Sequence, residues 1–179
     1  MPSIFTHALV PLAARLALGR GRIGNGLLVA GIGAAMLPDA DVAAFALGIP
    51  YADAFGHRGA SHSLLFAVLV AAAGAWVAWW RRCNVGRSAL LLFVCAVSHP
   101  LLDAMTSGGL GVALGWPLFE ARWFAPWRPI RVSPIGAAFF SARGLQTLWS
   151  EMRWVGVPLL SAAALWRLGH RRAKPMKAP

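Results

Sequence analysis

Five apolar segments divide the chain, and they constrain the fold more than any other feature. They cover residues 4–18, 27–47, 64–80, 88–106 and 154–168. About 20 apolar residues are enough for a helix to cross a bilayer. Segment 64–80 is continuously apolar and is the clearest span, whereas segment 4–18 is short for a complete crossing. The pattern predicts an all-α, polytopic membrane protein with about five, or four to five, transmembrane helices.

The composition agrees with a membrane protein of one domain. Hydrophobic residues make up 58% of the chain and charged residues 13%, and the mean hydropathy is +0.61. Soluble domains are less apolar and about twice as rich in charge. We therefore expect one membrane-embedded domain over residues 1–168 and a basic, disordered tail over 169–179. Within that domain, residues 108–150 interleave Trp, Arg and Pro, which predicts an interfacial loop or a short hairpin.

The net charge of +11 is distributed as expected for a membrane protein. Nucleic acid is not an expected partner, because the basic residues cluster at the ends of apolar segments. Cytoplasmic flanks of spans are rich in Lys and Arg, so the most basic side is assigned to the cytoplasm. The N-terminus is then outside and the C-terminus inside. That side would hold Arg15, Arg20, Arg22, Arg81, Arg82, Arg87, Arg167, Arg171, Arg172, Lys174 and Lys177.

Seven metal-capable side chains interrupt the apolar segments, and the predicted topology places all of them toward the outer leaflet. Buried carboxylates in lipid cost several kcal/mol unless they are paired or bound to a cation. Neutral imidazoles supply no compensating charge. A metal site recessed in the outer half of the membrane is the resulting prediction. The seven residues are His7, Asp39, Asp41, His57, His62, His99 and Asp103.

Other interpretations of this cluster remain open at this stage. A single polar residue at a helix end is more often a cap or a satisfied polar group than a ligand. Chains of Asp and His also serve ion or proton conductors and transporters. The basic tail would suit a regulatory membrane-bound binding protein. For Asp39 and Asp41 both to point inward, Pro38 must open the helix, because residues two apart do not share a helical face.

In their order and spacing, these motifs resemble those of the YdjM-like bacterial inner-membrane proteins. The resemblance covers roughly residues 1–135 and implies a multi-pass protein of the inner membrane with metal-dependent hydrolase chemistry. One departure is Ser61, where a Thr is expected before the second histidine, and it keeps a hydroxyl beside the site. The motifs are Thr6-His7, Leu-Pro-Asp-Ala-Asp at 37–41, His-Arg-Gly-Ala-Ser-His-Ser at 57–63 and Ser-His-Pro-Leu-Leu-Asp at 98–103.

The expected reaction is hydrolysis of an ester or phosphoester by metal-activated water. Mixed His and Asp ligation favours Zn²⁺, with Mn²⁺ or Fe²⁺ as alternatives. A recessed outer site suits a lipid or another amphiphilic substrate, and membrane lipids are expected partners. The substrate's identity and the oligomeric state do not follow from the sequence. The expected metal ligands are His7, Asp39, His62, His99 and Asp103.

Three residues near these ligands are assigned to catalysis. Asp41 and His57 are candidates for a general base, a supporting group or a further ligand. Arg58 is a candidate clamp for a substrate anion, and its alternative role is that of an interfacial arginine that contacts lipid headgroups.

Overall fold

The chain forms helices joined by irregular segments, in a computed structural model that describes residues 1–134 and 136–172. The predicted all-α class is confirmed. Among the described residues, the only β-structure is a pair of isolated β-bridges. In chain order the elements are α1 (Ile4–Leu18), α2 (Asn25–Met36), η1 (Leu37–Val42), α3 (Ala43–Ala46), η2 (Ala60–His62), α4 (Leu64–Trp80), α5 (Val85–Ala104), η3 (Gly136–Phe140), α6 (Ala142–Glu151), η4 (Met152–Gly156) and α7 (Val157–Arg172).

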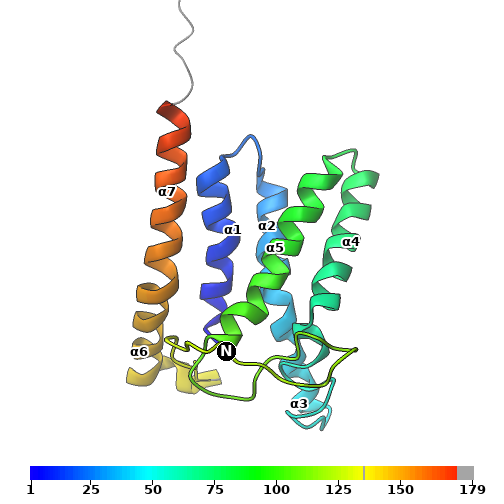
Figure 1. Cartoon of the computed structure of the whole chain (residues 1–179), viewed down its shortest axis with the longest axis vertical. Helices are drawn as coiled ribbons and strands as arrows, with labels where there is room; N and C mark the ends of the chain where they lie inside the picture. Colours follow the sequence, from blue (N-terminus) through cyan, green and yellow to red (C-terminus); the bar gives the residue numbers. More distant parts are fainter. Residues whose placement is uncertain (135, 173–179) are drawn as a thin grey trace, which may run out of the picture.

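The long helices run side by side (Figure 1). Helix α5 packs on α4 and α2, and α1 packs on α2 and α7. The turns at 19–24 and 81–84 lie at one end of the bundle, at the top of Figure 1. The start of α1, the end of α2 with η1, and the end of α5 lie at the opposite end with the long irregular segments. Polar motifs that are far apart in the sequence are therefore brought to one end of the bundle.

The predicted opening of the chain at Pro38 is confirmed. Helix α2 ends at Met36, and residues 37–42 wind into the tighter 3-10 helix η1, with Pro38 in its first turn. Proline has no backbone N–H and clashes with the preceding turn, so it fits best in the first turn of a helix. The change of winding places Asp39 near Nε2 of the His62 ring and Asp41 near Nδ1 of the same ring.

Helix α4 begins at Leu64, as its apolar run predicts. Ser63 caps this helix, because its hydroxyl accepts a 3.1 Å hydrogen bond from the backbone N–H of Phe66. The nearby Ser61 hydroxyl donates to Asp41. Helix α5 ends at Ala104, two residues before the end of the apolar segment 88–106.

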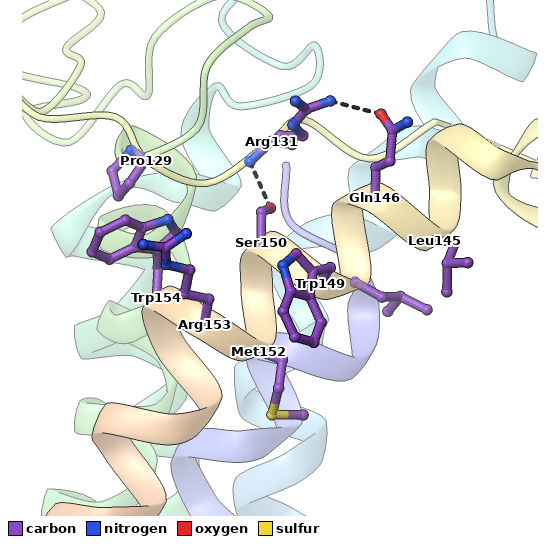
Figure 2. Close-up of a pocket in the computed structure, with 10 residues that line it drawn as sticks. Pro129, Arg131, Leu145, Gln146, Trp149, Ser150, Met152, Arg153 and Trp154 are labelled. Carbon is purple, nitrogen blue, oxygen red and sulfur yellow. Dashed lines mark hydrogen bonds between the residues drawn. The ribbon is translucent and has the colours of Figure 1, made fainter.

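The expected loop at 108–150 was wrong over its last third, which forms η3 and α6. Helix α6 is strongly amphipathic, with Thr147 and Ser150 buried and Leu145 and Trp149 exposed. The neighbouring Pro and Trp residues obscured this pattern in the sequence. In Figure 2 the guanidinium of Arg131 donates to Gln146 at 2.7 Å and its backbone N–H donates to Ser150 at 3.0 Å. These bonds hold the preceding segment against α6.

Helix α7 continues to Arg172, so residues 169–172 of the predicted tail are helical. The His170 ring donates a hydrogen bond to the Trp166 carbonyl at 2.9 Å and stacks on the Trp166 ring, with centroids 4.2 Å apart. Both contacts support the last turns of the helix. Residues 173–179 of that tail lie outside the described residues.

Burial follows a pattern opposite to that of a soluble protein. Large apolar side chains such as Leu69, Leu90 and Leu165 are exposed, whereas His7, His62 and Asp103 are fully buried. Within the described part of the chain, Asn25–Ala46 and Val85–Ala104 are long and apolar enough to cross a membrane, and Ile4–Leu18 and Leu64–Trp80 are shorter apolar helices. An apolar surface around a polar interior is typical of a protein surrounded by lipid.

Candidate metal centre

Four of the predicted ligands meet at one end of the bundle. Asp39 from η1, His62 from η2, and His99 and Asp103 from α5 each offer a ligand atom, and these atoms lie within 4.8 Å of one another. His62 Nε2 is 3.3 Å from Asp103 Oδ2, and His99 Nε2 is 3.3 Å from Asp39 Oδ1. Ligands around a tetrahedral Zn²⁺ lie about 3.3 Å apart, given bonds of about 2.0–2.1 Å. The spacing therefore matches that around a single divalent cation.

His7, the fifth predicted ligand, lies beside this group. Its ring stacks on His99 with centroids 3.7 Å apart, and its Nε2 is 3.8 Å from Asp103 and 4.0 Å from Asp39. Neither ring nitrogen of His7 has a hydrogen-bond partner, although the side chain is fully buried. His7 is thus close enough to be a further ligand, with a donor atom left free.

Contacts at the Nδ1 atoms of His62 and His99 orient both rings so that their Nε2 atoms face the centre. His99 Nδ1 is 2.7 Å from the carbonyl of Ala35, which can only accept, so this nitrogen carries the hydrogen. His62 Nδ1 is 3.2 Å from the Asp41 carboxylate. The two Nε2 atoms then face each other at 3.1 Å. Two lone pairs at this distance repel, so a proton or a metal ion must lie between the rings.

The carboxylates at the centre are short of partners. All four carboxylate oxygens of Asp39 and Asp103 are buried without a hydrogen bond. The charge partner of Asp103 is Arg58, whose Nε lies 3.0 Å from Oδ2. With Asp41, three carboxylates face one guanidinium, and two negative charges remain if the histidines are neutral. Buried charge of this kind is costly without a counter-ion, and the residues present fit a divalent cation.

The electrostatic field at His62 is negative. Burial by itself would lower the pKa of the imidazole, but the adjacent carboxylates of Asp103 and Asp41 raise it to about 9.

Arg58 is 0% exposed, and its guanidinium forms hydrogen bonds within the protein. Its guanidinium donates to the Thr106 hydroxyl at 2.9 Å and to the Gly108 and Leu110 carbonyls at 3.1 and 3.0 Å. The alternative interpretation as a headgroup-contacting arginine was wrong, because the side chain does not reach the surface. Contact with a substrate anion would require these bonds to break. The geometry instead directs Arg58 at Asp103.

A second layer of residues lies beside Nδ1 of His62, on the side of the ring that faces away from the central group. It consists of Asp41, His57 and Ser61. Asp41 accepts hydrogen bonds from His57 Nδ1 at 2.6 Å and from the Ser61 hydroxyl at 2.6 Å. His57 is outside the central group of four and contacts it through Asp41 and the edge of the His62 ring. A cavity of about 320 Å³ opens beside Asp41 and is lined by apolar side chains, including Phe55 and Trp116. Asp41 is therefore the charged residue of this layer that faces open space.

The loop at 47–59 is held close to the centre by backbone contacts. A Cβ on Gly59 would lie 2.2 Å from the Ala54 carbonyl oxygen, so only glycine fits there. Arg122 donates to the carbonyls of His57 and Asp53, and its partial burial lowers its pKa. Asp53, in the same loop, is exposed and accepts a hydrogen bond from the backbone N–H of Phe55.

Glu151 is the main residue that sequence reasoning missed. It is 2% exposed, and its carboxylate accepts hydrogen bonds from the Ser3 backbone, the Ser3 hydroxyl and the Thr6 hydroxyl. The end of α6 thus anchors the start of α1, one residue before His7. The signal that could have identified it is a lone carboxylate at the beginning of an apolar segment.

A larger cavity, of about 740 Å³, lies along α6 and η4 and contains none of the central residues (Figure 2). Trp149, Trp154, Arg131 and Arg153 surround it, and the Arg153 guanidinium lies 5.0 Å from the centre of the Trp154 ring. Aromatic and arginine side chains together are typical of a membrane interface.

Comparisons with known proteins extend the sequence resemblance beyond residues 1–135. The family described as YdjM inner membrane protein matches residues 1–174. The inner membrane protein YbcI of Escherichia coli (strain K12) is 44% identical over 171 residues, which cover 93% of this chain and 99% of YbcI. No solved structure matches the chain.

Proposed function

We propose, from the premise that the chain belongs to the YdjM family of inner membrane proteins, that it is a membrane-embedded metal-dependent hydrolase. The observation that carries the proposal is the buried group of Asp39, His62, His99 and Asp103. Their ligand atoms lie close together, and the carboxylate oxygens have no hydrogen-bond partner. His7 is the proposed fifth ligand.

The donor set supports Zn²⁺ as the proposed ion, since imidazole nitrogen and carboxylate oxygen both bind it well. Mn²⁺ and Fe²⁺ accept the same donors. Such an ion supplies Lewis acidity, which makes water a nucleophile near neutral pH. The chain's own residues position the ligands. The Ala35 carbonyl orients His99, Asp41 orients His62, and Arg58 orients Asp103.

Asp41 is the proposed proton acceptor. Its carboxylate contacts Nδ1 of His62, which belongs to the central group, and it also lines the cavity of about 320 Å³. His57 donates to the same carboxylate and keeps it ionised, which is the form that a proton acceptor requires. Arg58 is proposed as a positioning residue for Asp103, in place of the anion clamp expected from the sequence.

The proposed substrate is an amphiphilic ester or phosphoester. The cavity beside Asp41 is lined by Leu65, Phe66 and Leu69 of α4, together with Phe55 and Trp116. Leu65 and Leu69 are also exposed on the outside of the bundle. A substrate with an apolar chain could therefore approach from the lipid and place its polar bond near Asp41 and Ser61.

Asp41→Asn should retain the metal and lose turnover by about 100-fold or more, because a general base contributes about 10²–10⁴-fold. Asparagine keeps the shape and can still accept from His57. The measurement pairs metal content with hydrolysis of micellar nitrophenyl esters and phosphodiesters. Asp53→Asn is the matched control, because it removes an exposed carboxylate from the same region. Full activity of Asp41→Asn would exclude this residue as the base.

We also propose that the chain is multi-pass, with the metal centre toward the outside and the C-terminus in the cytoplasm. Arg20, Arg22, Arg81, Arg82 and Arg87 lie in or beside the turns at the opposite end, in agreement with the positive-inside rule. Ala52→Cys should be labelled by an impermeant thiol reagent on intact cells, and Gly21→Cys only after lysis. Both positions are exposed, and the exposed Cys83 would first be replaced by serine. The reverse labelling pattern would invert the orientation.

A further inference from the structure

A third cavity, of about 760 Å³, is lined by residues of the turns at the end of the bundle opposite the metal centre. The turns after α1 and α4, together with α2, α4 and α5, form its walls. None of the metal-capable residues of the candidate centre lines it. The cavity is thus a separate feature that the proposed hydrolase function does not use.

The rim of this cavity is strongly basic. Arg20, Arg22, Arg81 and Arg87 line it, and none of the six acidic residues does. All four arginines are exposed, and Arg87 donates to the carbonyl of Arg22 at 3.3 Å. Four positive charges around one cavity repel one another, so an anion at the rim would be stabilised.

The deeper wall of the same cavity is apolar. Leu27 and Ala30 of α2 line it together with Ala73 and Val77 of α4. The small residues leave this space open, and Leu92 packs so closely on Gly74 that a Cβ at that position would lie 2.0 Å from it. A basic rim above an apolar groove matches a ligand with an anionic head and a hydrocarbon chain.

We propose that this cavity binds an anionic phospholipid, with its phosphate among the four arginines and an acyl chain between α2 and α4. Basic pockets between transmembrane helices commonly take such headgroups. The apolar groove favours a lipid over a soluble phosphate, because a soluble anion would leave that surface without a partner. This site is independent of the proposed hydrolase activity.

The test compares neighbouring positions that differ in whether they line the cavity. Arg81 lines it and Arg82 does not, and Ala30 lines it while the exposed Val29 does not. Each arginine near a membrane surface contributes about 1 kcal/mol, so Arg81→Gln should weaken phosphatidylglycerol binding about fivefold. Ala30→Trp should fill the groove and remove most of the binding. Arg82→Gln and Val29→Trp should remain within about twofold of wild type.

Native mass spectrometry of the full chain in neutral detergent, titrated with phosphatidylglycerol, measures the bound lipid. Phosphatidylcholine should bind much less, and excess pyrophosphate should not displace the bound lipid. Equal binding by all four variants, or equal retention of phosphatidylcholine, would overturn the proposal. Displacement by pyrophosphate would also overturn it, in favour of a soluble phosphate ligand. Thermal unfolding of each variant in detergent confirms that it is folded before titration.

Discussion

Alanine at His62, His99 or Asp103 should each reduce the metal content of the purified protein to near background. Each substitution removes one donor from a group that shares a single centre, and the remaining donors would bind the ion far more weakly. The double variant His99→Ala with Asp103→Ala should be scarcely worse than either single variant, because the centre is already lost. Plasma mass spectrometry after chelator-free purification provides the measurement.

The control for this experiment is Asp53→Ala, which removes an exposed carboxylate outside the centre and should leave the metal content unchanged. Equal metal content in wild type and all ligand variants would exclude the metal centre. Proton or ion flux in liposomes would then be the next measurement, because the same buried Asp and His residues suit a conductor. Flux that persists after metal removal would support that alternative over the hydrolase.

Glu151→Ala should destabilise the protein by about 3 kcal/mol or more, because it leaves buried donors without an acceptor. The donors are the Ser3 backbone, the Ser3 hydroxyl and the Thr6 hydroxyl. Since His7 directly follows Thr6, the loss should also weaken metal binding by about 10-fold, within the range for groups that support a ligand. Thermal unfolding in detergent and a metal titration measure the two effects.

Two further variants separate the anchoring role of Glu151 from a general effect of charge. Glu120→Ala removes an exposed carboxylate and should change neither measurement. Glu151→Gln keeps one acceptor oxygen and should recover part of the stability. If Glu151→Ala matches Glu120→Ala in stability and metal affinity, the contact between α6 and the start of α1 has no energetic role.

Local sequence patterns were sufficient for much of the bundle. The apolar runs at 4–18 and 64–80 coincide with α1 and α4. Pro38 marked the change from α2 to η1, because its missing N–H is a local property. The family, too, was recognised from motif order and spacing, and it matches over residues 1–174. For the apolar runs and for Pro38, the physical cause lies within one short stretch of consecutive residues.

Helix α6 and the roles of Arg58 and Glu151 could not be obtained in the same way. Pro and Trp residues near α6 hid an amphipathic pattern whose apolar side faces outward. Arg58 lies next to His57 in a motif, which suggested a shared site facing substrate. Its partners Asp103 and Thr106 are more than 40 residues away, so its burial depends on how α5 packs.

The sequence by itself determined that the chain is a helical membrane protein with an unusual set of aspartates and histidines, since these follow from composition and local spacing. The inner-membrane family was identified from the resemblance of its motifs. Tertiary structure decided which of these aspartates and histidines meet. Asp39, His62 and Asp103 lie on three separate elements, and their inner atoms come together only because α2, α4 and α5 pack side by side. The same packing directs Asp41 to the outer side of His62. Charges and lone pairs interact over a few ångströms in space, whatever their separation along the chain.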